Sequence, residues 1–564
     1  MMQRRAHLAV CLLALWGCEG EVGSAGIERD SGDSIADASQ EPEQDAPVSE
    51  DGSIAQDAPA AQDTPLPEED VPLGELGEIV VPEAPGGAMS INPLIFPDPV
   101  TVGAYVDEAG AVEFVFDGET VQGLRDADSG RWEAQIHPAT VPEGSHPLGI
   151  TARGGDGQEK TIGVEILVVT QGIEFTNFAS AGSATTPRLH TIGDQLWVTW
   201  IQPSDSPRRL RAQRLDGAGR RLLDRDVLLT PADQDVVSAR AAAAPNGDIG
   251  ILYQRTDGSP YKNMLTVVKI ETGEVVVEPI ELDEPGDSTT ADGDIAFDTQ
   301  GFVAVYRNYD VEGSELRWVR VNPADASVQG PITAAASGDD SPVGSFTQPS
   351  FIRVAATPKH AMITFTRNHY DPVLDLMIPR AQAAVVGSDA TQLHEGILPQ
   401  PLELPFGFEA HVHLIRGELV PLWTLISLTD EEINPPHRIF GARVADLVGS
   451  APQGYEAVKI VEAPLLRGEM TLVEHPAAFA TMGWSDERQK DGGNDRISVY
   501  CASLDHDLSV KTETYISHSR LISSFSELSG AGLGHNTMMA WLDQRKGGSI
   551  ISPKSEVYFE TLWY

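Results

Sequence analysis

The chain has 564 residues, of which 39 are lysine or arginine and 84 are aspartate or glutamate, so its formal net charge is −45. A chain of this length can bury large cores and form several domains. Its charge argues against binding to a phosphate backbone, because proteins that bind nucleic acid neutralise phosphates with lysine and arginine. We therefore expect no nucleic acid among its partners.

Residues 1–17 have the composition of an export signal. Arg4 and Arg5 give a basic start, and residues 8–16 are apolar. This apolar stretch is too short to cross a bilayer, which takes about 20 residues, but it suits a signal peptide. The sequence therefore predicts export.

The segment Leu15-Trp16-Gly17-Cys18 follows directly and resembles the lipobox of bacterial lipoproteins. The resemblance implies cleavage before Cys18, lipidation of its thiol, and a membrane as partner through this anchor. Trp16 departs from the family pattern, which prefers a small residue there. Glu19 implies, by the same resemblance, sorting to the outer membrane. We expect a lipid-anchored protein of the bacterial outer membrane or cell surface. Ordinary secretion with an incidental Cys18 is the alternative, and periplasmic against outward display stays open.

Residues 18–85 are predicted to form a disordered acidic tether. They hold 19 acidic residues and one arginine, and no Phe, Tyr or Trp. Such a composition buries too little apolar area to offset the loss of chain entropy on folding. A spacer that lifts the folded domains from the lipid surface is the favoured interpretation, and calcium binding by the acids is the alternative.

Cysteine usage leaves no intrachain disulfide in the mature chain. Of the three cysteines, Cys11 leaves with the signal and Cys18 is predicted to be lipidated, so Cys501 remains. Cys501 lies in an apolar run, which favours a buried strand residue over a nucleophile.

Residues 86–170 are predicted to form a small β-sandwich, because short runs rich in β-formers alternate with Gly, Asp and Pro. The predicted strands cover 100–106, 112–116, 132–136, 147–152 and 160–169. Gly130-Arg131-Trp132 and Glu143-Gly144-Ser145-His146 resemble the late strands of bacterial immunoglobulin-like modules. The resemblance implies a spacer, with a binding role as the alternative.

Residues 171–564 repeat an apolar run that ends in an aromatic residue and is followed by a polar loop. These aromatics step by 53, 53, 59, 58, 61 and 57 residues. They are Trp200, Tyr253, Tyr306, Phe365, Trp423, Trp484 and Trp541. Four strands per unit, seven times over, predict an all-β fold with a seven-bladed β-propeller, in which the aromatic strand lies between neighbouring blades. A long series of β-sandwiches is the structural alternative.

The seventh unit is expected to be completed from the other end of the repeat region. Residues 556–563 give its third strand, and residues 173–178 alternate apolar with polar before the first unit. We expect 173–178 to form the outer strand of the last blade, which would cover an open edge. Pro379 and Pro421 interrupt two other predicted strands.

The last two units carry Trp484-Ser485-Asp486-Glu487-Arg488 and Trp541-Leu542-Asp543-Gln544-Arg545, which resemble repeats in exported bacterial propellers. Related arginines follow three other aromatics. The candidate binding residues are Arg255, Arg307, Arg367, Asp486, Arg488, Asp543 and Arg545. Loops at this position open on the face where propellers usually bind ligands, and an arginine ring could hold carboxylates or a sulfated sugar. The alternative is that the Asp and Arg of these units pair within a blade or between adjacent blades and stabilise the turn. The recurrence of the unit favours that structural interpretation.

Other chemistry has little support. His411 and His413 share one strand face, but spacing gives no third ligand, so we expect a packed pair and no metal. The sequence contains no sialidase-type Ser-x-Asp-x-Gly-x-x-Trp box, no Gly-x-Ser-x-Gly elbow and no phosphate loop. Catalytic residues stay unassigned, and no cofactor is expected.

The sequence favours a monomeric, surface-exposed binding protein that is not an enzyme, whose propeller binds a polysaccharide or a protein. The alternative is an extracytoplasmic carbohydrate-active enzyme, a glycoside hydrolase or lyase that uses acids at the mouth of the propeller. Buried acids with Tyr or His there would favour the enzyme, and an apolar filling would favour binding.

Overall fold

The structure is a computed structural model, and all residues that it describes belong to one compact unit of residues 71–564. The predicted signal peptide and Cys18 lie outside these residues, as do Arg488, Arg545 and the predicted tether up to residue 74. No helix in the described part is both long and apolar enough to span a membrane. The described residues are 75–95, 99–170, 173–174, 185–202, 205–256, 261–282, 288–309, 314–335, 349–371, 376–401, 404, 406–426, 436–444, 457–463, 466, 469–475, 478–486, 498–518, 528–543, 548–549, 552–553 and 556–563.

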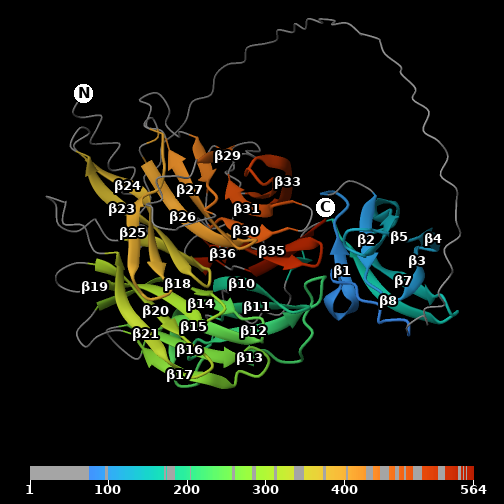
Figure 1. The fold of residues 1–564 in the computed structure, drawn as a ribbon, viewed down its shortest axis with the longest axis horizontal. Coiled ribbons are helices and arrows are strands. Elements are labelled where there is room, and N and C mark those ends of the chain that lie inside the picture. Colours follow the sequence, from blue (N-terminus) through green and yellow to red (C-terminus); the bar gives the residue numbers. More distant parts are fainter. Residues whose placement is uncertain are drawn as a thin grey trace, which may run out of the picture. The chain divides into compact units, whose positions relative to one another are not determined.

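The small β domain consists of two sheets that enclose one apolar core (Figure 1). The larger sheet has the order β1-β8-β7-β3-β4, with β1 parallel to β8, and the smaller has the order β2-β6-β5. The strands are β1 (Ala88–Ile91), β2 (Val100–Ala104), β3 (Ala109–Phe116), β4 (Glu119–Gln122), β5 (Leu124–Arg125), β6 (Trp132–Ile136), β7 (Gly144–Gly154) and β8 (Glu159–Val168). A short 3-10 turn, η1 (Pro85–Gly87), precedes β1, and a second, η2 (Pro138–Thr140), lies between β6 and β7. Burial alternates along β6 and β7, as expected for strands with one face on a core.

The folded sandwich includes residues that were predicted to belong to the tether. Leu76 and Ala84 belong to its core, and Val80 forms a bridge with Tyr105 next to β2. Glu83 is 1% exposed and pairs with Arg131 at 2.8 Å. Residues 75–84 therefore pack as part of the domain.

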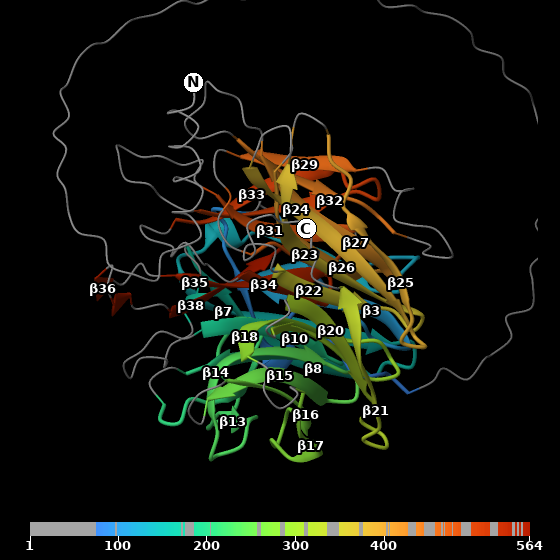
Figure 2. The same ribbon diagram turned by 90° about the vertical axis from the view of Figure 1, so that its left-hand side faces the viewer.

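Seven four-stranded antiparallel sheets follow and form the blades of a β-propeller, as predicted. The innermost strands contact one another in the closed order β10, β14, β18, β22, β26, β30, β34 and back to β10. Figure 2 shows β10, β18, β22 and β34 near the middle of the propeller, and β13, β17 and β21 near its edge.

The bounds of the blade strands, from the innermost outward, are as follows. Blade 1 has β10 (Thr185–Ile192), β11 (Gln195–Ile201), β12 (Leu210–Leu215) and β13 (Val227–Leu228). Blade 2 has β14 (Asp235–Ala243), β15 (Asp248–Thr256), β16 (Lys262–Lys269) and β17 (Val275–Glu281). Blade 3 has β18 (Ser288–Phe297), β19 (Phe302–Tyr309), β20 (Ser314–Val321) and β21 (Val328–Ala335). Blade 4 has β22 (Ser350–Ala356), β23 (His360–Asp371), β24 (Leu376–Gly387) and β25 (Gln392–Ile397). Blade 5 has β26 (Phe406–Ile415), β27 (Glu418–Ile426), β28 (His437–Gly441) and β29 (Val458–Ala463). Blade 6 has β30 (Thr471–Glu474), β31 (Ala480–Asp486), β32 (Ser498–Leu504) and β33 (Val510–His518). Blade 7 has β34 (Leu528–Leu533), β35 (Asn536–Asp543), β38 (Glu556–Leu562) and β9 (Ile173–Glu174), with a small hairpin of β36 (Gly548–Ser549) and β37 (Ser552–Pro553) between β35 and β38.

The seven repeating aromatics all lie on the second strand of a blade and are at most 2% exposed. Each second strand has both faces covered, which explains why the sequence shows continuous apolar runs and no alternation. The apolar clusters span neighbouring blades; one joins Trp200 of blade 1 with Phe559 of blade 7. The core therefore sits between the blades.

Blade 7 closes the ring with a strand from before blade 1. Glu174 of β9 pairs with Tyr558 of β38, and Ile173 pairs with Phe559, so β9 is the outermost strand of the last blade. This confirms the predicted closure for residues 173 and 174, while residues 175–178 of the predicted strand lie outside the described residues.

Both suspect prolines are accommodated within continuous strands. Pro379 of β24 lies opposite Asn368, beyond the last residue of the β24–β25 ladder at Gln382, so its missing N–H removes no bond from that ladder. The carbonyl of Pro421 in β27 accepts the N–H of Ala442 at 3.1 Å.

The sandwich packs on blades 1 and 7 of the propeller. Trp563 follows β38 and lies in the core of the sandwich, and its indole N–H donates to the carbonyl of Ser90 at 2.8 Å. The hydroxyls of Ser90 and Thr561 share a hydrogen bond of 3.1 Å. Gly217 is required here, because a Cβ at this position would lie 2.3 Å from the carbonyl oxygen of Glu83. The C-terminal strand thus joins the two domains.

Candidate functional site

The predicted arginines of blades 2, 3 and 4 contact residues of their own blade or of the segment before the next blade. Nη2 of Arg255 lies 3.2 Å from the Glu281 carboxylate on the outermost strand of the same blade. Arg367 pairs in the same way with Glu395 of β25 at 2.9 Å. Nη1 of Arg307 donates to the carbonyl of Pro349, which precedes blade 4, at 2.8 Å. These contacts stabilise the ends of second strands within a blade or between two blades.

The Trp-x-Asp unit of blade 6 is held together within its own strand. The indole N–H of Trp484 donates to Oδ2 of Asp486 at 2.8 Å, and Asp486 is fully buried. Blade 1 repeats this contact with an amide, because Trp200 donates to Gln202 at 3.4 Å. Asp543 ends β35, and its side chain, like Arg488 and Arg545, lies outside the described residues.

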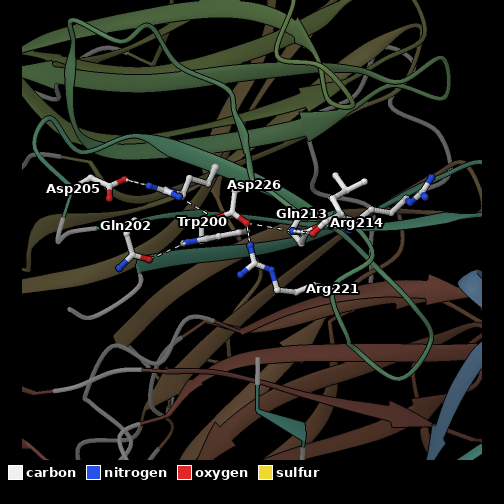
Figure 3. Close-up of polar contacts among 9 residues, drawn as sticks. Trp200, Gln202, Asp205, Gln213, Arg214, Arg221 and Asp226 are labelled. Carbon is white, nitrogen blue, oxygen red and sulfur yellow. Dashed lines mark hydrogen bonds and ion pairs between the residues drawn. The ribbon is translucent and has the colours of Figure 1, made fainter. Parts of the chain in front are cut away.

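Blade 1 also carries a polar network that joins β12 to the segment before β13 (Figure 3). Arg211 lies 2.9 Å from the Asp226 carboxylate and 2.7 Å from that of Asp205. Asp226 also pairs with Arg221 and accepts from the amide of Gln213 at 3.3 Å. All residues of this network belong to blade 1, so the network stabilises a local connection within that blade.

A different set of polar residues occupies one layer of the innermost strands. In each blade, one residue of the innermost strand pairs with the residue that directly precedes the repeating aromatic. We call these seven residues the axial layer. They are Arg188, Arg240, Asp294, Arg353, His411, Thr471 and Ser529.

Local backbone irregularities precede the axial layer in blades 1 to 5. The register between the innermost and second strands shifts just before Arg188, Arg353 and His411, and within the four residues before Arg240 and Asp294. Such bulges bend a strand and re-aim the side chains that follow, and they concentrate at functional sites. The innermost strands are thus distorted where they carry charged or imidazole side chains.

Three arginines of the axial layer converge on one carboxylate. Glu469 lies two residues before β30, and its Oε2 is 2.7 Å from Nη2 of Arg188. Its Oε1 is 3.0 Å from Nη2 of Arg240 and also pairs with Arg353. The four side chains are only 12–18% exposed. Arginines from blades 1, 2 and 4 thus meet a glutamate from blade 6 near the axis.

The guanidinium groups keep Glu469 ionised. Burial alone would raise the pKa of Glu469, but the attraction of Arg188, Arg353 and Arg240 outweighs burial and holds that pKa well below its usual range. A depressed pKa stabilises the fold at any pH above the ordinary glutamate value, and the stabilisation is lost as pH falls through the lowered value.

Two histidines of blade 5 flank this cluster. The rings of His411 and His413 are parallel within 2°, with centroids 6.4 Å apart. Burial, and then the positive charge of Arg353, hold the pKa of His411 well below 6.5 and lower the pKa of His413 to about 4. Nε2 of His413 is enclosed and has no hydrogen-bond partner among the described residues. Both imidazoles are therefore neutral at physiological pH.

Blade 3 contributes two acids whose oxygens bind backbone N–H groups of blade 4. Asp294 accepts from the N–H of Val354 at 3.0 Å, and Asp292 accepts from that of Ile352 at 3.4 Å. Asp292 also attracts Arg307, although burial, the larger effect, lowers the pKa of that guanidinium. These contacts join neighbouring innermost strands.

The described residues offer no metal centre, because no three His, Cys, Asp or Glu side chains among them converge closely enough. Cys501 of β32 is 4% exposed, and burial raises the pKa of its thiol, so it is protonated and unreactive. The arrangement at the axis suits the binding of an anion by guanidinium groups.

The sequence contains a signal for the axial layer that the aromatic repeat alone does not reveal. Arg188, Asp294, Arg353 and His411 each precede the aromatic of their unit by 12 residues, and Arg240 does so by 13. Aligning the units on the aromatic would have placed them together. Glu469 precedes Trp484 by 15 residues and falls outside this pattern.

No family model matches the chain, and no curated protein matches it. Among solved structures, domains 1–2 of Drosophila semaphorin 1a are similar at a TM-score of 0.40 and 9% identity, over 69% of this chain and 87% of that one. The α-L-arabinofuranosidase of Fusarium graminearum from family GH93 gives 0.37 and 7%, over 59% and 96%. That of Lactobacillus brevis gives 0.29 and 11%, over 48% and 94%. The propeller assignment rests on the strand pairing itself, and no statement about activity follows from these similarities.

Proposed function

We propose that the protein is a lipid-anchored binding protein of the bacterial outer membrane or cell surface, whose propeller binds a polysaccharide or a protein near its axis. The anchor rests on the lipobox-like segment that ends at Cys18. The binding role rests on the charge cluster around Glu469.

The contacts of Glu469 with three guanidinium groups are the observation that carries this proposal. Glycoside hydrolysis needs a carboxylic acid with a raised pKa to protonate the leaving oxygen, beside a second carboxylate. Three guanidinium groups lower the pKa of Glu469 instead. Among the described carboxyl groups, burial raises the pKa of Glu83, which lies in the sandwich. The axis therefore has the chemistry of an anion-binding site.

A carbohydrate-active enzyme remains the second candidate, because acids and histidines gather at the axis. Glu469, Asp292 and Asp294 lie on the innermost strands or directly before one, and His411 and His413 are neutral. A neutral imidazole is the form that a general base requires. This arrangement favours proton abstraction, as in a lyase, over hydrolysis.

A glycan array and a polysaccharide-degradation panel, both with the full chain, test the two candidates together. We expect retention on the array without new reducing ends or unsaturated products. Steady release of such products from any polysaccharide would replace the binding proposal with the enzymatic one.

Membrane fractionation tests the anchor separately. The chain should sediment with membranes, and the Cys18→Ser variant should be released, because the thiol that carries the lipid is gone. Retention of an unprocessed Cys18→Ser protein would contradict the anchor and leave the binding role intact.

A further inference from the structure

We infer that Arg188, Arg240 and Arg353 form a seat for a carboxylate of the ligand, and that Glu469 occupies this seat until the ligand replaces it. The inference rests on the proposed binding function and names its ligand class, a polysaccharide that carries uronic-acid carboxylates.

The seat has the shape of a carboxylate, because both oxygens of Glu469 are used. Oε2 contacts Arg188, while Oε1 is shared by Arg240 and Arg353. Guanidinium groups present a planar fork of N–H donors that matches two carboxylate oxygens. A ligand carboxylate could take the same three partners without rearranging them.

The arginines are held more firmly than the glutamate. All three lie within innermost strands, in a layer whose positions are set by the strand register. Glu469 lies outside any strand, in the connection before β30. Replacing it therefore requires movement of the Glu469 side chain, while the three arginines stay on their strands.

The seat is reachable from the face where second strands end. Leu466 forms a bridge with Asp486 at the end of β31, which places the connection before β30 on that face. The four side chains keep 12–18% of their surface exposed, so solvent reaches them. A carboxylate on a saccharide chain could therefore approach the seat from this face.

Two observations favour a carboxylated saccharide over an acidic protein. Among the large apolar side chains that the structure describes as exposed, Tyr261 is the one aromatic, at 47%, and it follows β15 on the same face. An exposed tyrosine ring offers the flat amphipathic surface on which a sugar can stack. The chain's net charge of −45 opposes the approach of an extended acidic protein surface, whereas a carboxylate of a short saccharide that reaches the three guanidinium groups is bound at short range.

Titration calorimetry with a galacturonic acid trimer tests the inference. Its methyl ester, which carries no charge, and a sulfated trisaccharide serve as ligand controls. Glu469→Gln removes the internal occupant and should tighten trimer binding about tenfold, because the seat is then always free. Arg353→Gln should weaken binding about tenfold or more, because a charge-assisted hydrogen bond is lost. The methyl ester should bind weakly to every form.

Asp226→Asn is the matched control variant. It also removes a carboxylate held by arginines, Arg211 and Arg221, but in the network of blade 1. We expect unchanged trimer affinity. A gain in affinity equal to that of Glu469→Gln would show a general charge effect and overturn the seat.

The remaining outcomes separate this inference from the proposed function. Equal binding of trimer and methyl ester, or no gain with Glu469→Gln, overturns the seat and leaves a binding protein for other glycans. A gain seen with an acidic peptide and not with the trimer overturns the ligand class. Product release from polysaccharides overturns the proposed function.

If Glu469→Gln does not fold, Glu469→Asp replaces it in the titration, because its carboxylate is set back by one methylene group. If neither folds, Glu469 is indispensable to the fold and cannot be displaced, so the inference fails.

Discussion

Two clusters in this propeller hold a carboxylate between arginines, and they differ in where their members come from. In blade 1, Asp226 is 5 residues from Arg221 and 15 from Arg211. At the axis, Glu469 is 116 residues from Arg353 and 229 from Arg240. The side chains of the two carboxylates are about equally buried, 12% and 14% exposed. The two clusters therefore do not differ in the burial of their carboxylates. They differ in how far apart along the chain each carboxylate and its arginines lie.

The difference indicates what each cluster is for. The members of the blade 1 network can meet as soon as their own blade forms, so they stabilise a connection. The axial cluster exists only when blades 1, 2, 4 and 6 have closed around it. A structural pin recurs from blade to blade, as the contacts of Arg255 and Arg367 do. The Glu469 cluster does not recur, because its arginines come from blades 1, 2 and 4 and its glutamate from blade 6, and this agrees with the proposed binding role.

Replacing each carboxylate by its amide should give the largest contrast. Glu469→Gln leaves three buried guanidinium groups without their shared anion and should lower the free energy of unfolding by about 3 kcal/mol. Asp226→Asn should cost about 1 kcal/mol, because Arg211 keeps Asp205 as a partner. Denaturant unfolding followed by tryptophan fluorescence measures both. Equal losses would show that the two clusters do the same structural work.

Mild acid should weaken the innermost strands, because buried neutral histidines lie on them, His190 in blade 1 and His411 and His413 in blade 5. The pKa of His413 is about 4 in the folded protein. Its ordinary value is about 6.5, so between these values the unfolded chain binds more protons and stability falls as pH falls. At pH 5 this costs about 1–2 kcal/mol. His413→Gln should therefore lose less stability between pH 7 and pH 5 than the parent chain does. An equal loss of stability between pH 7 and pH 5 in the two proteins would contradict the lowered pKa of His413.

The architecture could be predicted because it depends on signals that repeat. Burial of the second strand on both faces leaves an apolar run that ends in an aromatic, and this pattern predicts each blade. Edge strands leave no such signal. β4 and β5 of the sandwich are almost wholly exposed and were not predicted. Leu76 was placed in the tether because the acids around it hid its contact with the core.

The candidate site was predicted less well, because its geometry depends on ring closure. The arginines that follow the aromatics were predicted as candidate binding residues, but Arg255, Arg307 and Arg367 contact neighbouring strands or segments in the structure. The axial arginines are separated from Glu469 by whole blades, and no local pattern indicates that they meet it. An alignment of the units finds one layer of the axis, but it does not show which side chains converge there.

Coupling between members should sharpen the comparison further. In a double-mutant cycle, Arg188→Gln and Glu469→Gln should show an interaction energy of about 1 kcal/mol, because each removes a partner of the other. Arg188→Gln combined with Asp226→Asn should be additive within about 0.5 kcal/mol, because the two residues share no partner. Additivity in both pairs would mean that the 2.7 Å contact of Arg188 with Glu469 contributes no stability.

The smallest expected effect separates charge from geometry in blade 1. Arg211 reaches Asp205 through both Nε and Nη2, at 3.0 and 2.7 Å, and reaches Asp226 through Nη1. Lysine keeps the positive charge but lacks the fork, so it can serve one carboxylate well and not both. Arg211→Lys should lower the free energy of unfolding by about 0.5 kcal/mol, in keeping with partly exposed ion pairs. Arg353→Lys at the axis should lose more than this and should also weaken trimer binding, because three guanidinium groups there share one anion. If the two lysine variants melt alike and bind alike, the fork geometry at the axis has no special role, and the two clusters differ only in how their residues are brought together.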